Sequence, residues 1–374
     1  MSVSAEQRDT VDENATHVAV APPGTPLSAA RLHRVKKAYT TRSVAARIDA
    51  DPSGYALLDG PEVVPHPGDV VLARIERLGN HTRLESPVSR RQTLFVGDEV
   101  LVAYGHRYAP DQFEAEVPAD LGPAHLVAAG GVAALATAKH ARIADATALR
   151  PLGLLTDDHG IVTLERFATH RLSVAADTAR QSRRPTVVAV LGTSMNSGKS
   201  TTVSSLIRGA TRSGLTVAAG KVTGTGAGGD PHGFADAGAS AVLDFTDFGF
   251  PSTFRLEHAQ VRGLLTALVR ELSTPDVDVV VLEVADGLYQ DETSRLVSDS
   301  VFREVVDRVV FAADGAAGAV GGAEVLTRAG VPVTAVSGVL TSAPLAMREA
   351  QSLLSVPVIE TAALTEPDVV RAVL

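Results

Sequence analysis

The sequence predicts an α/β protein in which a mostly parallel, doubly wound sheet forms the C-terminal half and a small β-rich, barrel-like domain precedes it. From residue 185 onward, apolar strand candidates alternate with amphipathic helix candidates, as in right-handed βαβ units. Between about residues 55 and 118, short β-like segments alternate with Gly-containing turns. The length of 374 residues favours two or three domains.

The chain divides by composition into four parts. Residues 1–27 are polar and end in a Pro-rich stretch, so we expect a disordered tail. Residues 28–130 form the predicted β-rich domain. Residues 131–184 form a mixed connecting segment that ends in a basic, Pro-containing hinge. Residues 185–374 form the predicted parallel α/β domain.

The β-rich domain is predicted from three strand candidates, at residues 70–75, 93–96 and 99–104. Gly-Asp and Gly-Asn pairs supply the turns, and short strands at this spacing are typical of a small barrel. The Ala-rich sequence over residues 128–133 instead indicates a helix.

The C-terminal domain is predicted from seven apolar segments. The strand candidates are residues 186–191, 215–222, 241–245, 277–284, 308–313, 331–337 and 356–360. Apolar residues at helical spacing predict helices over 203–210, 261–272 and 296–305. Because ligands of parallel sheets bind at the carboxyl ends of strands, the polar residues that follow each strand are the candidate site.

The first strand of this domain leads into a phosphate-binding loop, in the sequence TVVAVLGTSMNSGKSTT of residues 186–202. Such loops bind phosphates with backbone N–H groups, a lysine and a hydroxyl that ligates Mg²⁺. The strict spacing fails, because the first glycine lies one residue too early, but strand, loop and helix arrive in the required order. The predicted nucleotide-binding residues are Gly192, Thr193, Ser194, Asn196, Ser197, Gly198, Lys199, Ser200 and Thr201.

A Gly-rich segment, residues 223–234, follows the second strand of this domain. So many glycines indicate a backbone that approaches a ligand closely, although a mobile surface loop is the alternative. Lys221 at the strand end is expected to face the transferred phosphoryl group. Asp230 is a candidate metal ligand, and Thr223, Thr225 and His232 are candidate substrate contacts, with His232 more often incidental in such a loop.

Acidic residues follow two further strands. Glu283 ends an apolar strand, where a carboxylate suits Mg²⁺ ligation, and its burial without a cation would be costly. Asp286 either contacts substrate or caps the following turn. Asp244 is expected to contact the substrate or to lie next to the ligands of the metal. Alternatively, it caps its own loop.

Composition excludes several classes of protein. There is no cysteine, so disulfides and thiolate sites are absent, and no run of eighteen apolar residues suits a membrane span. The net charge of −9 argues against general nucleic-acid binding. A basic stretch at residues 31–37 fits a solvated helix face or a phosphate-contacting arm. The acidic N-terminus lacks the features of a signal peptide, so we expect a cytoplasmic protein.

The loop, Lys221 and Glu283 together resemble dethiobiotin synthetase and its relatives. Their G-T-x4-G-K-T loop matches Gly192 to Ser200, and they carry a lysine after the second strand and a metal-binding glutamate after the fourth. The residues that follow Lys221 and Glu283 differ from those of that family. The layout is also similar to uncharacterised bacterial P-loop proteins with a separate N-terminal domain. The resemblance covers residues 185–374.

This resemblance implies a P-loop NTPase domain with an ATP and Mg²⁺ site, GTP being the alternative nucleotide. It implies activation of a small carboxylate or carbamate by phosphoryl transfer, as in a ligase or synthetase, with Lys199, Lys221 and Glu283 as catalytic residues and Ser200, Glu283 and Asp230 at the metal. It also allows a homodimer. The alternatives are a nucleotide-hydrolysing switch that acts on a protein partner through residues 223–250, and a binding module without turnover.

Overall fold

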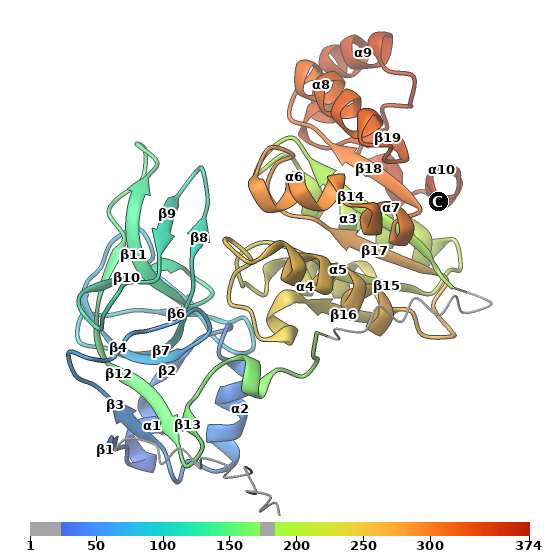
Figure 1. Ribbon diagram of the computed structural model, residues 1–374. Helices are drawn as coiled ribbons and strands as arrows, with labels where there is room; N and C mark the ends of the chain where they lie inside the picture. Colours follow the sequence, from blue (N-terminus) through green and yellow to red (C-terminus); the bar gives the residue numbers. More distant parts are fainter. Residues whose placement is uncertain (1–23, 173–183) are drawn as a thin grey trace, which may run out of the picture.

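The computed structural model describes residues 24–172 and 184–374, which form an N-terminal and a C-terminal domain (Figure 1). Most of the predicted disordered tail lies outside the described residues. Its last residues, 24–27, belong to the N-terminal domain, because Thr25 and Pro26 pair with the strand at residues 56–58 and Leu27 is buried.

The N-terminal domain combines short helices with one large and one small sheet. Its elements are β1 (Thr25–Pro26), α1 (Ala29–Arg34), β2 (Lys36–Lys37), α2 (Arg42–Ala50), β3 (Ala56–Leu58), β4 (Val70–Arg77), β5 (Arg83–Glu85), β6 (Arg91–Thr93), β7 (Glu99–Tyr104), β8 (Arg107–Tyr108), β9 (Phe113–Glu116), β10 (Ala124–Ala128), β11 (Val132–Lys139), β12 (Thr147–Asp157), β13 (Gly160–Ile161) and η1 (Glu165–Phe167).

The strand pairing of the large sheet returns on itself. From β12 it runs through β4, β7, β11 and β10, and β10 pairs with β12 again. Three apolar clusters fill the domain: one includes Ile48 and Leu72, the second Ile75 and Tyr104, and a smaller third one Val127 and Val132. The predicted barrel shape stays a prediction. The strands on both sides of residue 130 share this sheet, although we expected a separate connecting segment from residue 131.

Two sequence predictions for this domain were wrong. The Ala-rich sequence at 128–133 is not a helix: it comprises the last residue of β10, a turn at residues 129–131 and the start of β11, because both strands find partners that bury their apolar face. The predicted strand at 93–96 extends only to Thr93. Beyond it, Phe95 and Val96 are exposed in a turn, where Asp98 accepts a hydrogen bond from the backbone of Phe95.

The C-terminal domain alternates strands and helices, as the sequence predicts. Its elements are β14 (Thr186–Gly192), α3 (Lys199–Arg212), β15 (Val217–Lys221), α4 (Gly229–Ala237), β16 (Ala241–Asp244), η2 (Phe245–Phe248), α5 (His258–Leu272), β17 (Val279–Glu283), α6 (Asp291–Ser298), α7 (Ser300–Val305), β18 (Arg308–Ala312), α8 (Ala316–Arg328), β19 (Val333–Ser337), η3 (Val339–Ser342), α9 (Pro344–Leu353), η4 (Ala362–Thr365) and α10 (Pro367–Val373).

Six parallel strands form the sheet, in the order β16-β15-β17-β14-β18-β19. One face packs against α5 to α9, through residues such as Leu264, Phe302 and Leu326, and the other against α3, α4 and α10. The predicted seventh strand at 356–360 was wrong: it makes only an isolated bridge, Val336 with Val358. The predicted helix at 296–305 is two helices, because Asp299 caps α7.

The sheet order places the phosphate-loop strand at the centre of the domain. β14 lies between β17 and β18, so the ends of β14, β15 and β17 meet at one edge, with the N-terminal domain beside it (Figure 1). The predicted site residues that follow these three strands therefore lie close to one another.

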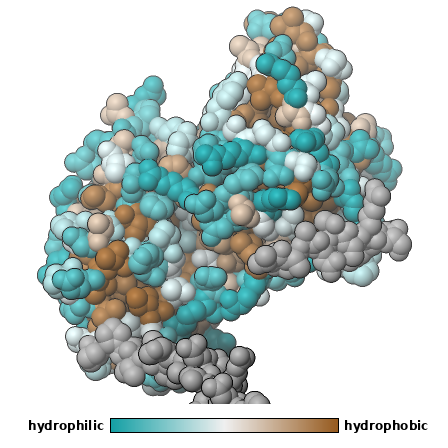
Figure 2. Space-filling view, viewed as in Figure 1, coloured by the Kyte–Doolittle hydropathy of each residue, from teal (hydrophilic) through white to brown (hydrophobic). Residues whose placement is uncertain are grey.

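The surface of the described residues bears on the predictions about membranes, partners and basic residues. No helix within the described residues is both long and apolar enough to cross a lipid bilayer. Apolar residues gather over α8 and α9 at the top of Figure 2, where Leu345 and Leu353 are 67% and 72% exposed. Exposed apolar residues are common on monomers, so the predicted homodimer stays a prediction. The basic residues Arg31, Lys36 and Lys37 pair with acidic residues of the same domain.

Candidate functional site

The loop between β14 and α3 has the geometry of a phosphate-binding loop. Asn196 and Gly198 adopt positive φ angles of 66° and 95°, which turns the chain sharply before α3 begins at Lys199. A Cβ on Gly192 would overlap Oγ of Ser197, so this glycine is required by the close approach of the loop. The first turn of α3 is thereby open to an anion.

Lys199 is held inside this loop. Its side chain is buried, and Nζ donates to the carbonyl oxygen of Ser194 at 2.8 Å. Burial lowers the pKa of Lys199, which the charges of Glu283 and Asp286 partly oppose. Oγ of Ser197 is buried without a hydrogen-bond partner among the described residues. A buried ammonium and an unpaired hydroxyl in one loop fit a phosphate group.

The beginning of the loop is anchored to the end of β18. The hydroxyls of Thr193 and Ser194 donate to the carboxylate of Asp314, at 3.1 and 3.3 Å. These two residues line a second, smaller cavity rather than the one beside Lys199. Their predicted contact with the nucleotide stays a prediction.

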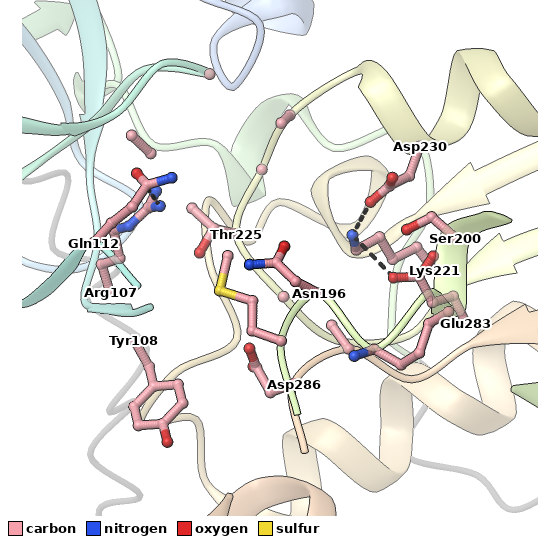
Figure 3. A pocket seen from close by; sticks show the side chains of 18 of the residues that line it. Arg107, Tyr108, Gln112, Asn196, Ser200, Lys221, Thr225, Asp230, Glu283 and Asp286 are labelled. Carbon is pink, nitrogen blue, oxygen red and sulfur yellow. Dashed lines mark hydrogen bonds and ion pairs between the residues drawn. The ribbon is translucent and has the colours of Figure 1, made fainter. Parts of the chain in front are cut away.

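Lys221, Asp230 and Glu283 converge beside Ser200. Nζ of Lys221 forms an ion pair with Asp230 and lies 3.4 Å from Oε1 of Glu283 (Figure 3). The Ser200 hydroxyl lies close enough to Asp230 and Glu283 to lower the pKa of both carboxyl groups. The second carboxylate oxygen of Glu283 is buried without a partner among the described residues. The structure thus brings together the lysine and all three predicted metal ligands.

Burial and charge oppose each other in this cluster. Burial alone would lower the pKa of Lys221, but Glu283 and Asp230 outweigh it and raise that pKa. Burial raises the pKa of Glu283, and Lys221 opposes that rise. For Asp230, burial would raise the pKa, but Lys221 and Ser200 lower it below its ordinary value. Asp230 and Lys221 are therefore charged near neutral pH.

A cavity of about 570 Å³ lies between this cluster and the N-terminal domain. Asn196 and Thr225 face it from the C-terminal domain (Figure 3). Asp286 also lines it, with a positive φ angle of 65° that non-glycine residues rarely adopt. Burial raises the pKa of Asp286 to about 6. Asp286 therefore faces the cavity, and no hydrogen bond within the described residues shows it as a cap; its contact with a substrate stays a prediction.

The N-terminal domain supplies the opposite wall, which sequence reasoning missed. Arg107 and Gln112 of the β8–β9 hairpin line the cavity across from Lys221 (Figure 3), and His81 of the loop after β4 also lines it. Nothing in the local sequence RYAPDQ resembles a motif, and no sequence signal places this hairpin against the phosphate loop. Only the packing of the two domains shows it.

Three predicted substrate residues lie away from this cavity. The Thr223 hydroxyl accepts a hydrogen bond from the backbone of Ala285 at 2.9 Å and is buried. His232 is exposed on α4. Asp244 caps η2 and accepts a hydrogen bond from the Tyr39 hydroxyl at 3.3 Å. Of the two interpretations of Asp244, the structure shows loop capping, together with a contact between domains.

The Gly-rich segment serves the contact between domains. A Cβ on Gly226 would lie 2.8 Å from Cγ2 of Thr40, and the backbone N–H of Gly228 donates to Glu85 at 3.1 Å. The segment is partly helical, since α4 begins at Gly229. The expectation that these glycines admit a ligand was therefore incomplete: at Gly226 and Gly228 the close neighbour is the other domain.

The donor set fits a magnesium ion held jointly with a nucleotide. No group of three or more His, Asp or Glu side chains in the described residues is arranged to hold a metal by itself. Mg²⁺ in phosphate-transfer sites is bound by one or two protein oxygens together with phosphate oxygens and waters. The Ser200 hydroxyl and the unpaired oxygen of Glu283 suit that role.

Comparisons with known proteins add no family. No family model matches the chain, and no curated protein does. Similar solved structures include two of the signal recognition particle receptor FtsY of Elizabethkingia anophelis, one of them in complex with GDP, each at 21% identity and a TM-score of 0.32 over 48% and 49% of this chain. Another is the signal recognition particle 54 kDa protein of Aeropyrum pernix K1 in complex with GDP, at 20% identity and a TM-score of 0.29 over 46% of this chain.

The chain spans 58%, 60% and 39% of the length of these three proteins, respectively. Similarity at this level carries no functional argument. None of the three is a dethiobiotin synthetase, and that resemblance stays an expectation.

Proposed function

We propose that this protein binds a nucleoside triphosphate with Mg²⁺ at residues 192–201 and transfers or hydrolyses its terminal phosphate. The observation that carries the proposal is the convergence of Lys199, Ser200, Lys221 and Glu283 at one edge of the parallel sheet. Phosphoryl transfer depends mainly on positioning and charge stabilisation, and these groups supply both.

Each residue has a distinct role in this proposal. Lys199 and the N–H groups of the first turn of α3 hold the β- and γ-phosphates. Ser200, Glu283 and Asp230 hold Mg²⁺, which when bound neutralises charge on the phosphate oxygens. Lys221 faces the terminal phosphate, where its raised pKa keeps it positively charged.

The main function that we propose is phosphoryl transfer to a small carboxylate. The cavity beside the cluster is about 570 Å³, large enough for the terminal phosphate and a small acceptor. An acceptor carboxylate oxygen forms the new bond to the γ-phosphorus, while the bond to the β,γ-bridging oxygen breaks. The electron pair leaves with the nucleoside diphosphate, and no proton transfer is required.

A nucleotide-hydrolysing switch is the second candidate. The observation that favours it is the course of residues 223–250, which run from the cluster to the N-terminal domain and contact Glu85 and Tyr39 there. A change at the terminal phosphate would then alter a contact between domains. In that case small carboxylates leave turnover unchanged and a protein partner accelerates it.

Calorimetry of the full chain tests the shared part of both proposals. Magnesium with ATP or GTP should bind to the wild type, and Lys199→Ala should abolish that binding because it removes the buried ammonium. Lys139→Ala, on β11 of the N-terminal domain, is the matched control and should bind like the wild type. Equal affinity of the wild type and Lys199→Ala would overturn the proposal. Phosphate release with and without small carboxylates then separates enzyme from switch.

A further inference from the structure

Arg107 is a buried cation without an acidic partner. Arg107 is only 6% exposed, yet its guanidinium forms no ion pair with a carboxylate in the described parts of the chain. Its Nη2 donates to Oε1 of Gln112 at 2.9 Å, and its Nε is buried without a partner. Buried arginines are normally paired, because an isolated buried charge is costly. Arg107, by contrast, has no anion in direct contact with its guanidinium among the described residues.

The surroundings of Arg107 leave its charge in place. His81 beside it has its pKa lowered to about 4, mainly by burial and then by Arg107, so it is neutral near pH 7. Burial lowers the pKa of Arg107 to about 10, against the charges of Asp111 and Asp286, so the guanidinium stays protonated. Asp111 itself accepts a hydrogen bond from Asn196 at 2.9 Å. Neither aspartate forms an ion pair with Arg107 within the described residues.

The β8–β9 hairpin holds Arg107 at the cavity. Asp111 at its tip contacts Asn196 of the phosphate loop, and the rings of Tyr108 and Phe254 lie 5.5 Å apart. Glu116 pairs with Arg255 at 2.5 Å. These contacts place Arg107 and Gln112 on one side of the cavity and Lys221 and Glu283 on the other, with Asn196 and Thr225 between them in Figure 3.

We propose that Arg107, oriented by Gln112, forms an oxyanion subsite in which the N-terminal domain receives the carboxylate of the phosphoryl acceptor. This inference rests on the proposed function and names the part of the site that selects the substrate. A guanidinium binds a carboxylate through two parallel hydrogen bonds, which gives direction as well as affinity. A terminal phosphate of the nucleotide presents the same oxyanion chemistry, and the experiment separates the two sources.

The experiment uses the full chain saturated with Mg²⁺ and the β,γ-imido analogue of whichever nucleotide binds, so that the phosphate loop and the terminal-phosphate position are filled. Acetate, succinate and inorganic phosphate are titrated by calorimetry. We expect at least one of these anions to bind the wild type, and Arg107→Gln to weaken it by about tenfold or more, as for a lost charged hydrogen bond. Arg142→Gln, an exposed arginine of the same domain, should leave it unchanged.

Thermal unfolding without ligands adds a readout that a purely structural arginine would not give. Because Arg107 is a buried charge without an ion-pair partner among the described residues, Arg107→Gln should unfold at the same or a higher temperature than the wild type. A lower unfolding temperature together with unchanged anion affinity would show a structural arginine and overturn the proposal.

Three other outcomes also overturn it. One is failure of all three anions to bind the wild type, and another is equal anion affinity of the wild type and Arg107→Gln. In the third, the variant loses affinity for the imido analogue but not for the diphosphate, and anion binding is unchanged, which places Arg107 on the terminal phosphate. If the wild type binds no nucleotide, the proposed function fails, whereas anion titration of the nucleotide-free protein still tests the Arg107 subsite.

Discussion

Nζ of Lys221 lies 3.4 Å from Oε1 of Glu283, and the same ammonium pairs with Asp230. These side chains are largely buried, so one lysine compensates two carboxylates away from bulk water. A buried charge that loses its partner costs far more than a surface pair does. The cluster should therefore be important for stability as well as for the phosphate chemistry.

Lys221→Met tests this dependence. The variant leaves Glu283 and Asp230 without their cation, so we expect the free energy of unfolding to fall by about 3–5 kcal/mol, measured with urea. The double variant Lys221→Met with Glu283→Gln should recover part of that loss, because it also removes one unpaired charge. Arg295→Met, which breaks an exposed pair with Asp291, is the control and should have little effect. A Lys221→Met protein as stable as this control would contradict the prediction.

Arg42 should act on the contact between domains rather than on the nucleotide. Its guanidinium pairs with Asp247 and lies 3.8 Å from Asp244, and none of the three lines the cavity. We expect Arg42→Met to lower the free energy of unfolding by several kcal/mol, about the cost of breaking a buried pair, and to leave nucleotide affinity unchanged. Arg47→Met, an exposed position on the same helix α2, is the matched control. Loss of nucleotide binding in Arg42→Met alone would mean that Asp244 serves the site.

Gly130 lies where the backbones of the two domains approach each other closely. A Cβ at this position would overlap the carbonyl oxygen of Gly226, and backbone cannot yield as a flexible side chain does. Gly130→Ala should therefore destabilise the protein by about 1–3 kcal/mol in thermal unfolding, as overpacking typically does. Gly229→Ala meets nothing within 4 Å and starts α4, so it should be neutral or stabilising. Equal stability of the two variants would mean that the domains do not meet as described.

The sequence predicted the C-terminal domain well because its signals are local. A buried parallel strand has a continuous apolar run, and six of the seven predicted runs are strands. Lys221 and Glu283 stand at the ends of neighbouring strands, so the parallel order alone brings them together. The exception, residues 356–360, has an apolar sequence but only one bridge to β19.

The parts that the sequence did not predict depend on contacts between distant segments. Arg107 and Lys221 are far apart in the chain and meet across the cavity only because the β8–β9 hairpin packs on the phosphate loop. The Gly-rich segment was interpreted as a ligand loop, since a glycine required by another domain has the same sequence signature. Ala128–Ala133 favours a helix by propensity, but strand pairing decides its structure.

Asp286 predicts a pH dependence of stability whose sign can be worked out. Burial raises its pKa in the folded protein to about 6, above its ordinary value near 4 in an unfolded chain. Between these values the folded state binds the proton more tightly, so this group's contribution to stability falls as the pH rises from about 4 to about 6, and it stays low above that. The loss is of the order of 2–3 kcal/mol.

Asp286→Asn removes this loss, because asparagine carries no charge and tolerates the positive φ angle of 65°. Urea unfolding should therefore show the variant more stable than the wild type at about pH 7, with the difference shrinking toward about pH 4. Asp158→Asn, an exposed position in the N-terminal domain, should show no such change. A constant difference between Asp286→Asn and the wild type across this range would mean that the carboxylate is not held in a low-dielectric site, and its place at the cavity beside Lys199 would need another explanation.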